Sequence, residues 1–392
     1  MIKLILCSMT SFINAQTIGG VLLALAALLA LVLSNSPWSE VYLRLLQFPV
    51  EIRLGGDALV LAKPMLIWVN DLWMAVFFFL VGLEIKRELL DGELASFRQV
   101  LLPAGAALGG MVVPALIYAA INANDAVALQ GWGIPMATDI AFALGILVLL
   151  GSRVPASLKV FLTAVAIIDD LGAILVIAFF YTSNLSVTML GAAGAGVLLL
   201  ALLNRLRVNA IGLYVLVGLV IWVCVLKSGI HATLAGVITA LAIPMSDGKG
   251  GSPLQTAEHV LHPWVAYLVL PVFAFANAGV YLGDASWSTL TQTVPLGIAA
   301  GLIVGKFLGV LGTSWLLTRF VGARLPEHST WLQFAGVAAL CGVGFTMSLF
   351  IGSLAFEGAD AIYASQVKIG VLLGSLLSAG VGVMLLICPA KP

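Results

Sequence analysis

Four ionisable side chains lie deep inside long apolar segments, where charged groups are rare. Asp169 and Asp170 are adjacent near the centre of one such segment, and Lys306 is equally deep in another. Asp139, beside Thr138, lies within a third. An ionisable side chain at the centre of a bilayer costs at least ~2.5–3.5 kcal/mol, so each of these residues is a functional candidate. Three carboxylates and one amine at one depth predict a shared polar cavity inside a membrane.

The residue types indicate a site where a cation competes with protons. A single Asp–Lys ion pair could be structural, and for Lys306 alone the structural and functional interpretations are nearly equal. Two further carboxylates exceed what one ion pair needs, and surplus negative charge attracts cations. Neighbours on a helix point about 100° apart, so one of Asp169 and Asp170 should face an ion path and the other a neighbouring helix or Lys306. Burial and mutual repulsion favour binding of a proton or a small hard cation at this pair.

The composition places the whole chain in a lipid environment. Its 392 residues are 61% hydrophobic and only 9% charged, against about 25% charged in an ordinary soluble domain. This excludes a soluble enzyme and a disordered chain. The 18 basic and 18 acidic residues cancel, so there is no basic field for phosphate backbones, and a nucleic-acid partner is excluded.

An all-α polytopic membrane protein is therefore expected. A helix needs about 20 apolar residues to cross a bilayer. About twelve such runs occur, near 16–34, 65–85, 99–121, 131–150, 157–181, 187–203, 210–226, 229–244, 260–282, 294–318, 331–356 and 363–388. With both termini inside, twelve Lys and Arg residues fall on the cytoplasmic side and five on the outer side. Because cytoplasmic loops carry the excess of positive charge, this bias predicts cytoplasmic termini.

The segment from about 48 to 63 departs from the helical pattern and predicts a small external β-hairpin. Its first arm, Val50–Leu54, alternates strictly in polarity, and Gly55-Gly56 separates it from a second arm, 57–61. Gly-Gly is a good two-residue hairpin turn. An isolated hairpin is marginal in water, so we expect it to pair with a second copy of the protein. An irregular loop is the alternative.

Two of the expected spans contain residues that interrupt a helix. Span four carries Pro135 between glycines and the Thr138-Asp139 pair, and span eleven carries Gly342 and Gly344 in mid-run. Unwound backbone at membrane depth is tolerated only where it lines a cavity or is buried in protein. Each span is thus a candidate discontinuous helix, although Gly and Pro are also common in unbroken transmembrane helices.

The positions of the two breaks predict inverted-topology repeats within a single transporter domain. The breaks are seven spans apart, an odd number, so the two helices enter the membrane from opposite sides. The repeat units would be about 99–181 and 294–388. Because half-helix ends carry partial charges of about ±0.5, Asp139 could neutralise facing N-termini and Lys306 facing C-termini.

Eight segments, in order along the chain, carry a family resemblance. They are 75–88, 137–145, 166–174, 226–236, 258–264, 273–279, 305–306 and 341–348. On these segments the chain resembles the NhaA-type sodium/proton antiporters of bacterial inner membranes. The match runs from about residue 64 to the C-terminus, and the first span and the hairpin also fit.

The resemblance implies a twelve-helix fold in which the discontinuous spans four and eleven cross. It implies a secondary active transporter, not an enzyme, that needs no cofactor. Sodium, and also lithium, would leave the cell in return for a larger number of external protons, in the service of pH and sodium homeostasis. The implied partners are the lipid bilayer and a second copy of the chain, joined as a homodimer through the outer hairpin.

The resemblance also assigns roles to the buried charges. Asp170 would be the principal cation and proton carboxylate, with Asp169 assisting at the sodium site and able to bond Lys306. Thr138 and Asp139 would line the same site. The second proton could be carried by Asp169 or by Lys306, and the sequence leaves this open.

A pH-responsive face is implied at the cytoplasmic end. The residues that match the family's pH-sensing positions are Glu84, Arg87, Glu88, Glu258, His259 and His262. Histidine titrates near neutrality, and Glu258 and His262 share one helical face. A solvated helix end with ordinary charges is the alternative. Gln255 and Thr256 stand where the best-known members carry a basic pair, so the pH of activation could differ.

Three rival functions fit parts of this pattern. A proton pump with a chromophore on Lys306 is disfavoured by twelve spans with two breaks. An intramembrane aspartyl protease needs carboxylates that face each other from different helices, unlike the adjacent Asp169 and Asp170. A passive cation channel would conduct without coupling to protons. The sequence favours coupled exchange.

Overall fold

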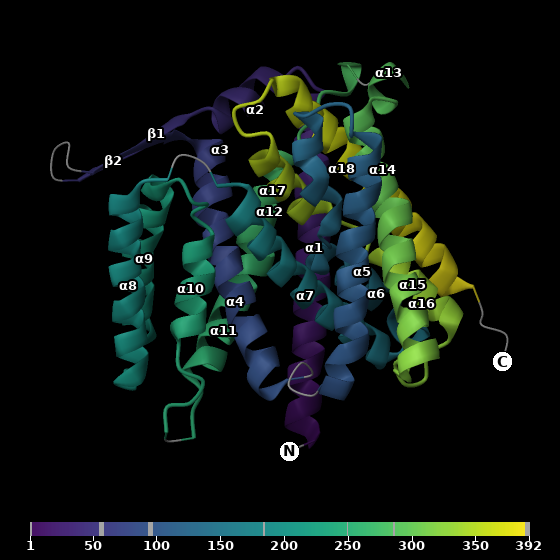
Figure 1. Ribbon diagram of the computed structural model, residues 1–392, viewed down its shortest axis with the longest axis horizontal. Helices are drawn as coiled ribbons and strands as arrows, with labels where there is room; N and C mark the ends of the chain where they lie inside the picture. The colour runs from purple at the N-terminus through teal and green to yellow at the C-terminus, as the bar shows by residue number, and fades with distance from the viewer. Residues whose placement is uncertain are drawn as a thin grey trace. The chain divides into compact units, whose positions relative to one another are not determined.

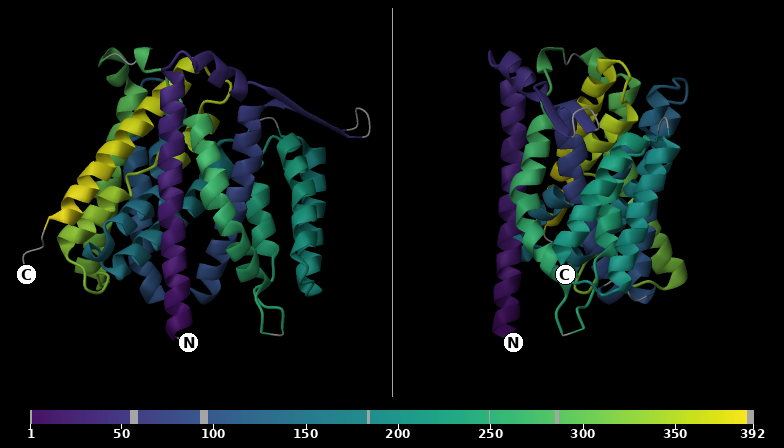
Figure 2. Two further views of the ribbon diagram at one scale, coloured as in Figure 1. Left: turned by 180° about the vertical axis from the view of Figure 1, so that it is seen from behind. Right: turned by 90° about the vertical axis from the view of Figure 1, so that its left-hand side faces the viewer.

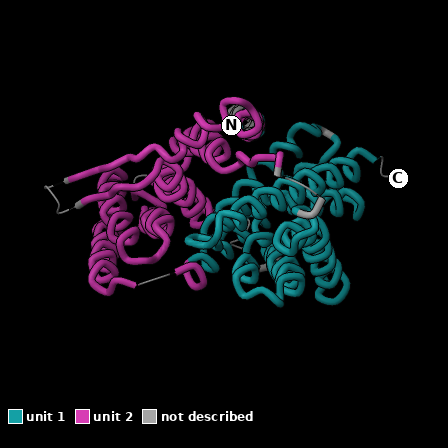
Figure 3. The backbone as a smooth tube through the Cα atoms, turned by 90° about the horizontal axis from the view of Figure 1, so that it is seen from above, with its two compact units in different colours: residues 1–24, 88–177, 284–392 teal, residues 25–87, 178–283 magenta. Residues whose placement is uncertain are grey.

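The computed structural model describes residues 2–54, 59–92, 97–182, 185–248, 250–284 and 287–388, and these are mostly helical (Figure 1). The chain divides into two compact units (Figure 3). Unit 1 comprises residues 1–24, 88–177 and 284–392, and unit 2 comprises 25–87 and 178–283. Unit 1 therefore contains nearly all of the two ranges that the sequence predicts as inverted repeats.

Unit 1 is built from helices in three separate stretches of the chain. In order, its elements are α5 (Phe97–Ile121), the 3₁₀ helix η3 (Ala128–Met136), α6 (Ile140–Leu149), η4 (Gly151–Arg153), most of α7 (Ala156–Phe180), α13 (Trp287–Leu290), α14 (Thr293–Ala300), the π-turn η7 (Gly301–Gly305), α15 (Lys306–Leu316), the π-turn η8 (Leu317–Val321), α16 (Trp331–Leu340), α17 (Phe345–Ala355) and α18 (Ala361–Ile387). From α14 to η8 the helix runs without interruption, so Lys306 lies near the middle of one long span.

Unit 2 combines helices with the hairpin. Its elements are α2 (Ser39–Leu46), β1 (Pro49–Leu54), β2 (Leu59–Pro64), α3 (Met65–Trp68), the π-turn η1 (Val69–Trp73), most of α4 (Met74–Asp91), α8 (Val187–Arg205), α9 (Ile211–Ser228), α10 (Leu234–Ala242), α11 (Pro253–Trp264), the π-turn η5 (Val265–Val269) and α12 (Leu270–Asn277). The first helix, α1 (Ile2–Ser34), and the short η6 (Leu282–Asp284) contribute residues to both units.

Hydropathy identifies a multi-pass membrane protein. Within the described residues, nine helices are long and apolar enough to cross a bilayer, and the number rises to eleven when two bent helix pairs are each taken as one span. In the most apolar window of α8 only 11% of residues are buried. An apolar helix surface that is left uncovered is what a lipid environment accommodates, and a soluble protein would have to bury it.

The count of twelve spans stays a prediction, because α10 is too short to meet the same criteria. It has nine residues, or about 14 Å at 1.5 Å per residue, against a hydrocarbon core of about 30 Å. The first span also differs from the expected 16–34, since α1 is already helical at Ile2.

The predicted hairpin is present, with a register that the sequence pattern left open. β1 and β2 pair in antiparallel register with Leu54 opposite Leu59 (Figure 2). Four residues, 55–58, therefore connect the strands, and they lie outside the described residues. The predicted two-residue turn at Gly55-Gly56 falls on residues outside the described ones. A turn at Gly55-Gly56 implies a register two residues away from the observed pairing of Leu54 with Leu59. A shift of two residues keeps every side chain on the same face, so the alternating pattern could not distinguish the two registers.

Candidate functional site

The first interruption in unit 1 follows Pro135 directly. The 3₁₀ helix η3 ends at Met136, Ala137 and Asp139 have extended backbone, and α6 begins at Ile140. A proline has no N–H to continue the helical ladder, which favours a break at this point. Asp139 caps the new helix, because its Oδ1 accepts a hydrogen bond from the N–H of Phe142 at 3.0 Å.

The second interruption separates α16 from α17, which are bent by 40° relative to each other. Two glycines make this break possible. A Cβ on Gly342 would collide with the carbonyl oxygen of Leu302, and a Cβ on Gly344 would lie 3.0 Å from the carbonyl oxygen of Ala137. Backbone therefore packs against backbone here, and no larger residue fits without moving a main chain.

The two interruptions are hydrogen-bonded to each other. The N–H of Asp139 donates to the carbonyl oxygen of Val343 at 2.6 Å. Oδ2 of Asp139 accepts from the N–H of Thr346 at 3.0 Å and from its hydroxyl at 2.5 Å. Ser348 Oγ donates to the carbonyl oxygen of Ile134 at 2.8 Å. One carboxylate thus lies at the N-termini of both α6 and α17, where helix dipoles favour negative charge.

A second carboxylate, Asp169 on α7, forms the centre of an ionic cluster. Its Oδ2 makes an ion pair with Nζ of Lys306, and both side chains are completely buried. The same oxygen is 2.7 Å from the hydroxyl of Thr138, which also lies 2.9 Å from the carbonyl oxygen of Cys341. The hydroxyl has one proton, so both contacts are hydrogen bonds at once only when Asp169 itself carries a proton. Thr138 therefore links the first break to the protonation state of Asp169.

The remaining oxygen atoms give the cluster capacity for a further ligand. Oδ1 of Asp169 has no hydrogen-bond partner in the described part of the chain. Asp170, the next residue on α7, is 2% exposed. Among the described residues, no group of three or more His, Cys, Asp or Glu side chains is placed to hold a metal ion. A cation at Asp169 and Asp170 would therefore also need oxygens from Thr138 or the main chain.

Local geometry also positions Lys306. The π-turn η7 comes immediately before it in an otherwise α-helical span. Single π-turns inside α-helices rotate the residues that follow, and they are frequent at functional sites. The turn was not predicted from the sequence, because hydropathy reports the depth of a residue and not the local winding of its helix.

Comparison with known proteins identifies the family. The model of the family described as Na⁺/H⁺ antiporter 1 matches residues 10–386. The chain belongs to this family. An antiporter named Na(+)/H(+) antiporter NhaA in Albidiferax ferrireducens is 73% identical over 391 residues, which cover 100% of both chains. Antiporters of the same name in Salmonella arizonae and Citrobacter koseri are each 55% identical over 375 and 372 residues, covering 95% of both chains.

Of the six candidate pH-sensing residues, the structure shows an ion pair between Arg87 and Glu258. Nε of Arg87 lies 3.0 Å from Oε2 of Glu258 in an ion pair within unit 2. Glu84 and His262 are half-buried, and His259 is exposed. Glu88 is assigned to unit 1 and the other five candidates to unit 2.

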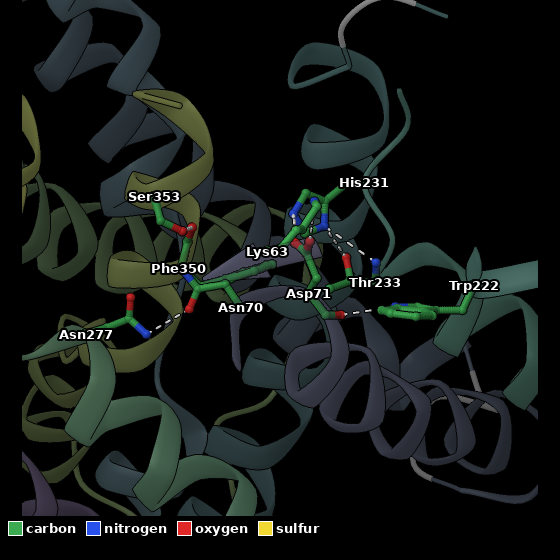
Figure 4. A network of polar contacts seen from close by, with 9 residues as sticks. All are labelled: Lys63, Asn70, Asp71, Trp222, His231, Thr233, Asn277, Phe350 and Ser353. Carbon is green, nitrogen blue, oxygen red and sulfur yellow. Dashed lines mark hydrogen bonds and ion pairs between the residues drawn. The ribbon is translucent and has the colours of Figure 1, made fainter. Parts of the chain in front are cut away.

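Unit 2 also contains a polar network that the sequence did not predict (Figure 4). Asp71 accepts a hydrogen bond from Nζ of Lys63 at 3.0 Å and lies 3.8 Å from Nε2 of His231. The carbonyl oxygen of Asp71 accepts from Nε1 of Trp222 at 3.3 Å, and Nδ1 of His231 is 2.8 Å from the hydroxyl of Thr233. Asp71 lies inside the apolar run 65–85, and the same search for charges within apolar runs could have found it.

Proposed function

We propose that this chain exchanges Na⁺ for H⁺, with Asp169 and Asp170 as the carboxylates that bind both ions. The observation that carries this proposal is the buried contact of Lys306, Asp169 and Thr138 in unit 1. Membership of the Na⁺/H⁺ antiporter 1 family and the NhaA names of the relatives support the choice of ions.

A count of charges supports a site for one cation. The negative charge of Asp139 is compensated by the N-termini of α6 and α17, whose N–H groups donate to it. Among the buried residues that the structure describes in unit 1, this leaves the carboxylates of Asp169 and Asp170 and the ammonium of Lys306. The surplus of one negative charge is neutralised by one proton or one cation. A small hard cation takes oxygen ligands, and Oδ1 of Asp169 is an oxygen without a described partner.

The exchange follows from competition for the same oxygens. When Na⁺ binds between Asp169 and Asp170, a proton on either carboxylate is displaced by charge repulsion. The ion also competes with Lys306 for Asp169, so the ammonium loses the partner that stabilises its charge. A second proton could then leave from Lys306 or from Asp169. Release of two protons for one Na⁺ would make the exchange electrogenic, and Li⁺ would serve as an alternative small cation.

The interrupted spans provide a mechanism for alternating access. We take Asp139 to compensate the two half-helix N-termini, and the discontinuous spans four and eleven to cross at this point within inverted repeats. Rocking of the repeats would then expose the same carboxylates first to the cytoplasm and then to the outside. Unwound main chain lets the half-helices move without breaking a continuous helical ladder.

The test is proton release from the purified protein. In weakly buffered detergent solution, addition of Na⁺ should release H⁺, and in proteoliposomes a sodium gradient should drive a change in internal pH that responds to an imposed membrane potential. Asp170→Asn should abolish both signals. Asp125→Asn, which makes the same chemical change on an exposed carboxylate outside the cluster, should retain them. If Na⁺ released no H⁺ at any pH, coupled exchange would be excluded.

Sodium uptake into proteoliposomes under an imposed pH gradient distinguishes exchange from passive conduction. A cation channel would pass Na⁺ down its gradient at a rate independent of the proton gradient. An antiporter should instead accumulate Na⁺ against its gradient when a pH gradient is imposed. Uphill movement that disappears in Asp170→Asn therefore favours the antiporter.

We propose regulation by pH for titratable residues in the second half of α4 and from the middle to the end of α11. The half-buried ion pair between Arg87 and Glu258 supports this, with Glu84, Glu88, His259 and His262 as further titratable groups. Replacing Glu258 by Gln should shift the pH at which exchange begins without abolishing exchange. An unchanged pH profile would assign this ion pair a structural role.

Dimerisation is proposed through the β1–β2 hairpin. The described sheet has only two strands, so its outer edges are open for pairing with a second copy. Exposed Glu51, Ile52 and Arg53 lie on β1. Deleting residues 50–62 should convert a dimer to a monomer in light-scattering measurements, and a dimer that persists would exclude this interface. We further propose the bacterial inner membrane as the location, with both termini cytoplasmic, which reporter fusions at each end would test.

A further inference from the structure

A surface pocket of about 530 Å³ lies in unit 1 where α7 and α16 begin, and no step of the exchange uses it. The residues that line it are Arg153, Pro155, Ala156, Ser157, Glu327, His328 and Gln333. Its volume falls within the ~300–1,000 Å³ that is usual for sites of small ligands. The pocket is therefore large enough to hold a polar group with several hydrogen-bonding atoms.

The two loops that form the pocket are held together by hydrogen bonds. Ser157 Oγ donates to the carbonyl oxygen of Glu327 at 2.5 Å, and Nε2 of Gln333 donates to the carbonyl oxygen of Arg153 at 3.3 Å. Gln333 also takes part in the capping box at the start of α16. These bonds use main-chain carbonyl groups, so they fix the loops without occupying the charged ends of Arg153 and Glu327.

The pocket carries charges of both signs. Arg153 and Glu327 are exposed, and neither side chain makes an ion pair with any residue that the structure describes. His328 adds a second side chain able to donate to an anion. A guanidinium binds phosphate oxygens with two parallel hydrogen bonds, and a carboxylate accepts from a primary ammonium. The pocket thus matches a ligand that carries a phosphate and an ammonium together.

The position of the pocket indicates where such a ligand comes from. Both α7 and α16 continue from here into apolar helix, so the pocket lies at a membrane–water interface. Trp331, the first residue of α16, is 41% exposed, and Val160 on α7 is 47% exposed. Exposed tryptophan is typical of the headgroup level, and apolar side chains beside the pocket can contact acyl chains.

From this arrangement we propose that the pocket binds the headgroup of phosphatidylethanolamine. Arg153 and His328 hold the phosphate, and Glu327 accepts hydrogen bonds from the ammonium. A phosphatidylcholine headgroup has the same charges but no N–H to donate, and phosphatidylglycerol has no cation for Glu327. The bound headgroup stabilises the loop that precedes α7, and α7 is the helix that carries Asp169 and Asp170.

The experiment measures thermal stability of the purified full-length protein with four probes. These are diheptanoyl phosphatidylethanolamine, the matching phosphatidylcholine, the matching phosphatidylglycerol and inorganic phosphate. We expect the ethanolamine lipid to raise the melting temperature saturably, and the other three to act at least about tenfold more weakly, as loss of a charge-assisted hydrogen bond requires. Equal effects of the ethanolamine and choline lipids would overturn the proposal. If phosphate alone reproduced the effect, the pocket would be a phosphate site and not a lipid site.

Four variants test which residues bind the lipid. Arg153→Gln should weaken binding of the ethanolamine lipid about tenfold. Glu327→Gln should abolish the preference for ethanolamine over choline while leaving the phosphate interaction intact. Arg324→Gln removes the same charge as Arg153→Gln from an exposed residue outside the pocket lining, and it should leave binding unchanged. Unaltered lipid binding by Arg153→Gln and Glu327→Gln would overturn the proposal. Asp170→Asn should bind the lipid normally, so a failure of the transport mechanism would remain distinguishable.

Discussion

The carboxylate of Asp139 accepts hydrogen bonds from two different half-helices, through Phe142 at the start of α6 and Thr346 at the start of α17. Oδ1 faces the N–H of Phe142, and Oδ2 faces both the N–H and the hydroxyl of Thr346. Both oxygens therefore meet donors. A side chain that is only an acceptor is required at this position.

Asp139→Asn should consequently destabilise the protein despite its close similarity in shape. Whichever way the amide is turned, its NH₂ group faces a main-chain N–H, and one buried donor loses its partner. We expect a loss of about 2–3 kcal/mol in the free energy of unfolding. The matched control is Asp360→Asn, because Asp360 caps α18 at an exposed position where Asn is also a good cap. Similar melting temperatures for Asp139→Asn and the native protein would contradict this account.

The ion pair of Asp169 and Lys306 should behave as a coupled unit. Removing one partner leaves an uncompensated charge among completely buried atoms. Lys306→Met and Asp169→Asn should each cost about 3–5 kcal/mol, and the double variant should cost less than the sum of the two. Thermal unfolding of all four proteins in one detergent measures the coupling. Strictly additive losses would mean that the pair contributes no mutual stabilisation.

Gly342 should tolerate no side chain. The Cβ of Gly342→Ala would meet the carbonyl oxygen of Leu302, so α16 or the Lys306-bearing helix must shift. Overpacking of this kind costs about 1–3 kcal/mol, and exchange should fall with it, because the shift displaces the break next to Thr138. Both effects can be measured on one preparation, by thermal unfolding in detergent and by exchange in proteoliposomes.

The control for this substitution is Gly312→Ala, since nothing lies within 4 Å of its Cβ position in α15. There the better helix propensity of Ala should be neutral or stabilising by about 0.5–1 kcal/mol. A Gly342→Ala protein as stable and active as the native one would mean that the main chain at this break has room for a Cβ, contrary to the close approach of Gly342 and Leu302.

Burial of the candidate ion-binding residues could be predicted from sequence, but their partners could not. The position of a residue within an apolar run gives its depth in the bilayer. On this basis Asp169, Asp170 and Lys306 were predicted to lie at the same depth. The contact of Thr138 with Asp169 depends on how far each helix is rotated and shifted against its neighbours, which no periodicity in one chain reports. The assignment of Asp170 as the principal ion-binding residue stays a prediction.

The hairpin and the polar network of unit 2 show two other limits of the sequence. Alternation fixes which face a strand residue occupies but leaves a two-residue ambiguity in register, so the pairing of Leu54 with Leu59 could not be predicted. Asp71 is near the start of its apolar run, where snorkelling makes a charge less costly. Its contacts with Lys63 and His231 depend on how the helices and the hairpin pack, so they required the structure.

Asp125 should make the stability of the protein depend on pH at acid pH. Its carboxylate accepts hydrogen bonds from the N–H groups of Ala128 and Val127, at 3.0 and 2.9 Å. The bond from Ala128, followed by those from Val127 and Tyr363, lowers the pKa of Asp125 from its ordinary 3.8. Because the folded state has the lower pKa, the ionised carboxylate stabilises the fold at pH values above about 3.8, and this contribution is lost as the pH falls through the folded value.

The measurement is the difference in melting temperature between the native protein and Asp125→Asn. Both main-chain N–H groups donate to Oδ1, so the asparagine oxygen can still accept both hydrogen bonds. Its NH₂ group cannot accept from the hydroxyl of Tyr363, and asparagine does not titrate in this range. The difference should be small, favour the native protein and remain constant from pH 7 to pH 5, and it should shrink as the pH falls below about 4. A difference that widened on acidification would mean that Asp125 is more easily protonated in the folded protein than in the unfolded chain, which would contradict the role of the Ala128 and Val127 N–H groups.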